Sequence, residues 1–107
     1  MSTARYTLKG EYESTQEYAA KKGVSFKIKY AEAAAIMLKP CVFCGGKTPG
    51  YEGNSLMRRE WGVGFANENC YSACWPCKRV LDQGDLNSKL DHLQAICAHL
   101  QTHQLEL

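Results

Sequence analysis

The sequence predicts a small α+β domain, and three observations support this prediction. A chain of 107 residues has room for one domain with a modest core, so it often needs a cross-link beyond hydrophobic burial. Two Cys-x-x-Cys pairs, Cys41/Cys44 and Cys74/Cys77, can supply one. Around these pairs, segments of helical composition are interrupted by short segments with a strand-like pattern. We therefore expect two cysteine knuckles, short strands and flanking helices.

The first third of the chain is expected to hold a helix, a strand and a second helix. Residues 11–22 are mostly good helix formers, and Gly23 is suited to end this helix. Residues 24–30 alternate apolar and polar side chains, which is typical of a half-buried strand. Residues 31–38 are rich in alanine and predict a helix. It should end at Lys39, because the residue before a proline is disfavoured in helical conformation.

The remainder is expected to hold two short strands and two helices. The glycine-rich stretch 47–69 indicates loops around strands near 56–58 and 64–66. The second cysteine knuckle should open a helix that runs to about residue 83. The last helix should begin near residues 87–88, an Asn-Ser pair that can cap it. Its apolar residues recur at three- and four-residue steps and are Leu90, Leu93, Ile96, Cys97 and Leu100.

The expected domain covers residues 18–103. Residues 1–17 are predicted to form an N-terminal arm, loose over 1–10, and the start of a lead-in helix, and residues 104–107 form a tail. No segment approaches the roughly 20 apolar residues of a membrane span, and the first residues lack an apolar stretch of signal-peptide length. An intracellular location in the cytoplasm or nucleus is therefore expected, with no membrane partner. The balance of 13 Lys and Arg against 11 Asp and Glu neither requires nor excludes a nucleic-acid partner.

The paired cysteines predict one structural zinc ion per chain. In a reducing compartment such pairs usually bind metal, and the alternative here is two disulfides or unrelated buried thiols. A gap of two residues lets both thiolates of a pair reach one ion, and two pairs complete a tetrahedron. Four thiolates leave no open position for water, so the ion should do no chemistry. The predicted ligands are Cys41, Cys44, Cys74 and Cys77.

Two cysteines lie outside this set. Cys70 could replace Cys74 as a ligand, but only Cys74 has the two-residue gap to Cys77. Cys97 lies on the apolar face of the last helix and is expected to be a small buried residue, because free cysteine is often fully buried.

Several motifs follow one another in a known order. Tyr18–Phe26 matches a lead-in helix and strand, and Pro40-Cys41-Val42-Phe43-Cys44-Gly45 matches a Pro-Cys-x-Tyr-Cys-Gly knuckle. Met57–Ala66 then occupies an Asp-Arg-Ile-Asp-Asn-Ser-Lys-Gly-Tyr-Thr motif. Asn69-Cys70 occupies an Asn-Val step, and Cys74-Trp75-Pro76-Cys77-Lys78 a second knuckle. In this order, without gaps, the chain resembles the small zinc-containing HNH (His-Me finger, ββα-metal) nucleases of phages and large DNA viruses.

The resemblance also implies a degenerate catalytic site. In that family a divalent metal separate from the zinc is bound by the opening Asp and by the Asn or His after the last cysteine. Met57 and Lys78 stand at these two positions, and neither offers the oxygen ligands that Mg²⁺ requires. Arg58 stands where many members have the general-base histidine, and arginine stays protonated in proteins. Glu60 and Asn69 keep a carboxylate and an amide but do not replace the lost pair. No catalytic residue is therefore expected.

Cations near this degenerate site are candidates for nucleic-acid binding. On an HNH frame Arg58, Arg59, Lys78 and Arg79 would converge on the groove where family members hold a phosphate backbone. An ordinary solvated surface is the equal alternative. The lysines within residues 21–29 form a second basic strip that is expected to be only solvated.

Histidine and tryptophan residues are expected to have ordinary structural roles. His92, His99 and His103 on the last helix are interpreted as solvated surface residues rather than a second metal site or a catalytic base. Trp61 and Trp75 could stack on bases, but both are expected to pack, with Trp75 covering the metal.

The function predicted from these features is a catalytically inactive HNH-like zinc domain that binds DNA or RNA weakly and non-specifically through a basic relic of the active-site groove. The alternative is a structural or adaptor subunit of a larger assembly, such as a viral one, and the location would then include the virion. A third hypothesis is an active metal-dependent nuclease that uses Glu60, Asn69 and a histidine from elsewhere.

Overall fold

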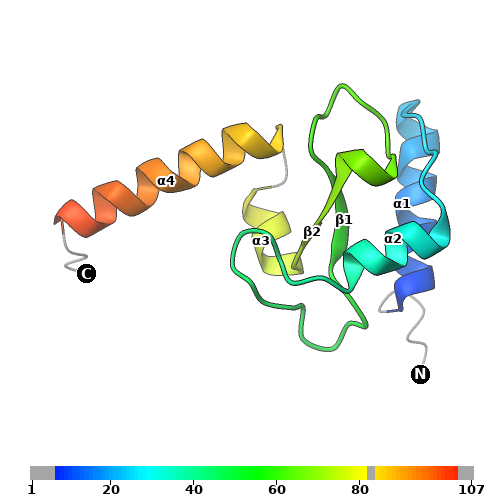
Figure 1. Ribbon diagram of the computed structural model, residues 1–107, viewed down its shortest axis with the longest axis horizontal. Helices are drawn as coiled ribbons and strands as arrows, with labels where there is room; N and C mark the ends of the chain where they lie inside the picture. The colour runs from blue at the N-terminus through cyan, green and yellow to red at the C-terminus, as the bar shows by residue number, and fades with distance from the viewer. Residues whose placement is uncertain (1–6, 82–83, 104–107) are drawn as a thin grey trace.

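The computed structural model describes residues 7–81 and 84–103 and confirms a small α+β domain (Figure 1). Its extents are 44 × 35 × 22 Å. Its elements in chain order are α1 (Leu8–Lys22), α2 (Tyr30–Met37), β1 (Ser55–Arg58), the 3-10 helix η2 (Asn67–Asn69), β2 (Cys70–Ala73), α3 (Trp75–Val80) and α4 (Leu86–His103).

The two strands form an antiparallel hairpin at the centre of the molecule, between the α1–α2 pair and α3 (Figure 1). Met57 lies opposite Tyr71, and every residue of both strands is buried. Because successive side chains of a strand point to opposite faces of the sheet, consecutive residues pack in different hydrophobic clusters. Leu56 packs in the cluster that includes the buried residues of α1 and α2, whereas Met57 packs in the cluster that includes Cys41 and Cys74. The hairpin therefore joins the helical layer to the cysteine knuckles.

Helix α1 begins earlier than the sequence composition indicated. Thr7 caps it by accepting a hydrogen bond at Oγ1 from the Gly10 N–H, at 2.9 Å, so residues 8–10 belong to the helix and not to an arm. The helix ends at Gly23, as expected, in the left-handed conformation with φ 69°. Helix α1 also runs without a break through positions 17 and 18, where the N-terminal segment was expected to meet the domain. Residues 1–6 and 104–107 lie outside the described part of the chain.

The strand predicted over residues 24–30 is reduced to one bridge. Its alternation is present, since Phe26 and Ile28 point inward and Lys27 is exposed, but only Phe26 pairs, in parallel with Phe65. The strand predicted at residues 64–66 is likewise reduced to this one bridge, at Phe65. The two segments approach closely at Gly64, where a Cβ atom would lie 2.5 Å from the Ser25 carbonyl oxygen. The second strand of the hairpin is instead β2.

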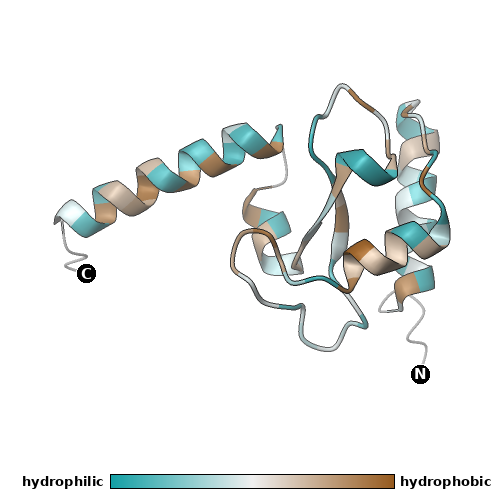
Figure 2. Cartoon of the chain, viewed as in Figure 1, coloured by the Kyte–Doolittle hydropathy of each residue, from teal (hydrophilic) through white to brown (hydrophobic). Residues whose placement is uncertain are grey.

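Helix α4 projects away from the rest of the domain (Figure 1). Its first turns are anchored by the buried Leu86 and Lys89, and the Lys89 Nζ donates to the Tyr71 hydroxyl at 3.2 Å. Further along, apolar and polar residues alternate around a helix that stands clear of the body in Figure 2, and Ile96 is 40% exposed. The expectation that Cys97 is buried is wrong, because its thiol lies on this projecting part and is exposed.

Helix α3 ends at Val80 rather than near residue 83, and residues 82–83 are outside the described ranges. None of the described helices combines the length and apolar character needed to cross a membrane.

Candidate functional site

The four predicted ligand cysteines come together at one point. The sulfur atoms of Cys41, Cys44, Cys74 and Cys77 all lie within 4.8 Å of one another. The Cys44 and Cys74 Sγ atoms are 3.6 Å apart, far beyond the roughly 2.05 Å of a disulfide, and all six cysteines are free. A tetrahedral ion with bonds of about 2.3 Å to sulfur requires sulfur–sulfur edges of about 3.8 Å. The cluster therefore fits one four-coordinate metal ion.

The first knuckle is shaped to present thiolates. Gly45 turns the chain with φ 76°, and its N–H donates to the Cys41 carbonyl at 2.8 Å. Two backbone N–H groups point at sulfur, from Phe43 to Cys41 Sγ and from Gly46 to Cys44 Sγ, each at 3.4 Å. Such donors favour the charged form of a thiol. The knuckle is thus preorganised for a cation.

The pKa shifts of the cluster thiols differ in direction. Burial acts to raise the pKa of Cys41, but backbone hydrogen bonds outweigh it and lower that pKa to about 7. Burial raises the pKa of Cys74 and of Cys77, and the neighbouring cysteine side chains contribute. A divalent cation favours the thiolate form of its cysteine ligands.

Cys70 is excluded as a ligand. It is buried in the cluster that includes Ala19 and Leu56, and it is not part of the sulfur cluster. Burial raises the pKa of its thiol to about 11, so the thiol is protonated at neutral pH.

A buried asparagine holds the first knuckle against the hairpin. The Asn54 side chain donates from Nδ2 to the Lys39 carbonyl at 3.1 Å, the Gly46 carbonyl at 3.2 Å and the Ser72 hydroxyl at 3.1 Å. Its Oδ1 accepts from the Thr48 N–H at 2.9 Å and from the Thr48 hydroxyl at 3.2 Å. Only 2% of Asn54 is exposed. Sequence reasoning missed this residue, because a lone asparagine in a glycine-rich loop matches no motif.

Thr48 extends the connection to the second knuckle. Its Oγ1 accepts a hydrogen bond from the Trp75 N–H at 2.8 Å. On the other side, the Val42 N–H donates to the Ser72 carbonyl at 2.9 Å. Hydrogen bonds through the loop before β1 and through β2 therefore fix the position of the two knuckles relative to each other.

Asn69 braces the loop that follows β1. Its Oδ1 accepts from the Glu60 N–H at 3.1 Å. Its Nδ2 lies 3.2 Å from the Glu60 and Val63 carbonyls and donates to the Gly64 carbonyl at 2.9 Å. Asn69 is buried, whereas the Glu60 side chain is exposed. Asn69 thus fixes the course of the backbone in this loop.

Arg58 is buried rather than open to solvent. Only 6% of it is exposed, and its Nη1 donates to the Trp61 carbonyl at 2.6 Å. The guanidinium carbon lies 5.3 Å from the ring centre of Trp61 and 5.1 Å from that of Phe65. Cation–π contacts and the carbonyl compensate for removing this charge from water. Trp61 was expected to pack, and it does so against the Arg58 guanidinium. The residue is half-buried.

A recess of about 740 Å³ lies between α1, β1 and the second knuckle. It contains two of the four predicted nucleic-acid contacts, Arg58 and Lys78, and the Lys78 Nζ lies 5.1 Å from the ring centre of Trp75. The side chains that line the recess are Glu11, Ser14, Thr15, Tyr18, Tyr51, Leu56, Met57, Arg58, Trp61, Phe65, Trp75 and Lys78.

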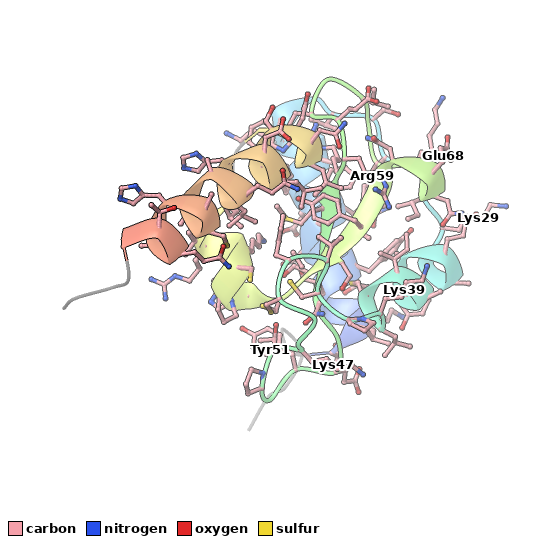
Figure 3. All side chains as sticks on the ribbon, turned by 60° about the vertical axis from the view of Figure 1, so that its left-hand side comes forward. Lys29, Lys39, Lys47, Tyr51, Arg59 and Glu68 are labelled. Carbon is pink, nitrogen blue, oxygen red and sulfur yellow. The ribbon has the colours of Figure 1, made fainter. Side chains whose placement is uncertain are left out.

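Arg59 and Arg79 do not line this recess. Both are exposed, and the Arg59 N–H donates to the Asn69 carbonyl at 2.6 Å, beside η2. Figure 3 shows Arg59 and Glu68 on this part of the surface, with Lys29 projecting outward from α2 nearby in the view. Two of the four candidate cations therefore share one site, and two lie on the outer surface.

The remaining candidates differ in environment. Met57 is 6% exposed and packs beside Tyr71 in the cluster that contains Cys74. Trp75 is 41% exposed, so the expectation that it packs over the metal is wrong.

The histidines of α4 lie on its surface where they are described. His92 and His99 are exposed, as expected of surface residues, while the side chain of His103 lies outside the described part. Among the described residues, the only group of three or more potential metal-binding His, Cys, Asp or Glu side chains is the cysteine cluster.

Neither a protein-family model nor a curated protein sequence matches the chain. Among solved structures, the fold is similar to that of the rare-cutting HNH restriction endonuclease PacI, reported for its mechanism of DNA perturbation. The TM-score is 0.59 and the sequence identity 18%, over 89% of this chain and 80% of that chain. At this identity the likeness concerns the fold, and the chain therefore has an HNH-type fold.

Proposed function

We propose that the chain is a zinc-stabilised HNH-fold domain that binds nucleic acid without cutting it. The observation that carries the proposal is the position of Arg58 and Lys78. The motif resemblance assigns them to the positions of the family's general base and of a metal ligand, and both side chains line one recess on an HNH-type fold. A cation in place of a metal ligand can contact phosphate directly by charge-assisted hydrogen bonds. The half-buried Lys78 is available for this contact, whereas the buried Arg58 contributes its positive charge to the recess.

The zinc assignment rests on the donor set. Cys41, Cys44, Cys74 and Cys77 would hold the ion, and four thiolates favour zinc in a tetrahedral structural site. When bound, it would neutralise the thiolates and cross-link the two knuckles. The chain's own hydrogen bonds, through Asn54 and Thr48, already orient both knuckles toward that centre.

The proposed lack of cleavage rests on residue chemistry. A divalent catalytic metal needs oxygen or imidazole donors, and Met57 offers a buried thioether. Arg58 cannot accept a proton from water and is held between two aromatic rings. Lys78 adds a positive charge to the same recess.

The purified protein should therefore cut neither DNA nor RNA above a metal-free control when Mg²⁺ or Mn²⁺ is added. Plasmid nicking and cleavage of a labelled RNA measure this. The triple variant Met57→Asp, Arg58→His, Lys78→Asn restores the family's ligands and base, and weak Mg²⁺-dependent nicking is expected from it. Robust cleavage by the unmodified zinc-loaded protein, abolished when Mg²⁺ and Mn²⁺ are omitted and by Glu60→Gln, would contradict the proposal and favour the active-nuclease hypothesis.

Nucleic-acid binding should be weak and strongly dependent on salt. With two to four phosphate contacts on a duplex, the logarithm of affinity should fall against log salt with a slope of about −2 to −4, and Kd should be micromolar or weaker at physiological salt. Sequence preference should be slight, because phosphate contacts position a protein without reading bases. Lys78→Ala should lower both affinity and slope, measured by fluorescence anisotropy at several salt concentrations. The exposed Lys27 serves as the charge-matched control, and Lys27→Ala should have little effect.

A protein partner is the second candidate function. The exposed apolar residues of the projecting α4, such as Ile96, favour it, because such side chains are often covered by another protein surface. If the chain binds neither duplex nor single strands at low salt, this assembly function becomes the better explanation.

A further inference from the structure

The recess is too large and too aromatic for phosphate contacts alone. Its volume of about 740 Å³ lies within the range of roughly 300 to 1,000 Å³ typical of sites for organic ligands. A phosphate oxyanion would fill a small part of this space. The aromatic side chains that line it are Tyr18, Tyr51, Trp61, Phe65 and Trp75.

Two of these rings are exposed. Tyr18 of α1 is 40% exposed and Trp75 at the start of α3 is 41% exposed. Elsewhere the aromatic residues pack on one another, as in the edge-on contact of Tyr12 with Phe26 at 5.3 Å between ring centres. Among the residues that the structure describes, neither Tyr18 nor Trp75 pairs with another ring. Both therefore offer aromatic surface to a ligand in the recess.

Polar groups accompany these rings. Lys78 lies over Trp75, so a base that stacks on this indole would bring its phosphate close to the ammonium group. Arg58 reaches the recess from β1, between Trp61 and Phe65. Glu11 is the single anionic side chain among the lining residues, against two cations. The combination of flat aromatic surface and positive charge suits a nucleotide.

We infer that this recess takes an unstacked base, and that the domain prefers single-stranded DNA or RNA to a duplex. The inference rests on the proposed function and specifies its ligand. In a duplex the bases are paired and stacked, so one could enter the recess only by flipping out, which costs a few kcal/mol. A single strand presents its bases for stacking without that cost.

Intrinsic fluorescence gives a direct measurement, because the chain has two tryptophans and both line the recess. The zinc-loaded protein is titrated at low salt with oligo-dT and oligo-U of about 12 nucleotides, within known site sizes of single-strand binders, and with a duplex of the same length. We expect quenching by both single strands and affinity at least about tenfold higher than for the duplex. The two single strands differ in their sugar and separate a DNA ligand from an RNA ligand.

Variants then locate the stacking contact. Trp75→Ala should weaken single-strand binding by about tenfold or more while leaving the salt slope unchanged, because stacking releases no counterions. Trp75→Phe should retain most of the affinity. Tyr18→Ala, on α1 and remote from the knuckles in sequence, gives a second test if Trp75→Ala loses zinc. Tyr30→Ala is the matched control, since Tyr30 is 42% exposed but does not line the recess.

The outcomes separate the two proposals. Equal affinity for duplex and single strand, with no effect of Trp75→Ala or Tyr18→Ala, would overturn the stacking inference and leave nucleic-acid binding intact. Absence of binding to every strand at low salt would overturn both.

Discussion

Replacement of Cys77 by serine is expected to unfold the protein. The four sulfurs of the two knuckles lie within 4.8 Å of one another, so a bound ion would cross-link segments far apart in the chain. Structural zinc contributes on the order of 10 kcal/mol or more of apparent binding free energy in zinc-finger peptides, which is comparable to the whole stability of a small domain. Far-UV circular dichroism and zinc content measure the effect. EDTA should produce the same loss of structure in the unmodified protein.

Cys97 provides the matched control for this substitution. Its thiol is exposed on α4 and lies outside the metal cluster, so Cys97→Ser should keep both the spectrum and one zinc per chain. A Cys77→Ser protein that folds fully, or a wild-type protein that contains no zinc, would contradict the assignment of a structural zinc site.

The second large effect is expected at Asn54. Asn54→Ala leaves the Thr48 N–H without its acceptor and removes the hydrogen bonds from Asn54 to the Lys39 and Gly46 carbonyls, which keep the Ser72 hydroxyl and the Cys41 N–H as donors. A buried donor left unpaired costs about 1 to 3 kcal/mol, and each further lost hydrogen bond about 0.5 to 1.5 kcal/mol. We therefore expect the free energy of unfolding to fall by about 3 to 5 kcal/mol, with weaker retention of zinc because the first knuckle loses its brace.

Urea unfolding of the zinc-loaded protein measures this change. Asn67→Ala is the control, since Asn67 is exposed in η2 and should alter stability little. An Asn54→Ala protein that unfolds at the same urea concentration as the wild type would show that the hydrogen-bond network does not stabilise the domain.

Local spacing and periodicity were sufficient to predict much of the fold. The α+β class, α2 and β1 follow from residue patterns within single segments, and the sulfur cluster follows from two-residue gaps. The strand β2 could not be found in this way. Its residues Cys70–Ala73 are all buried and show no alternation, so its pairing with β1 depends on the loop that returns the chain.

Properties that depend on tertiary packing were the least predictable. Arg58 is buried because Trp61 and Phe65 fold over it, and neither contact is visible in a motif. Trp75 and Cys97 lie at positions whose local pattern indicated packing, but both are exposed in the structure. The number of elements in a small domain limits how many apolar side chains can be buried.

The contacts of Asn69 bear on which side chains of its loop can be exchanged. Its amide holds the loop from Glu60 to Gly64 by backbone carbonyl and N–H groups, which every amino acid except proline supplies in full. The exposed side chains at positions 60 and 63 can therefore be exchanged while the turn keeps its course. One buried asparagine thus keeps the backbone of this loop in place independently of which side chains the loop presents to solvent at those two positions.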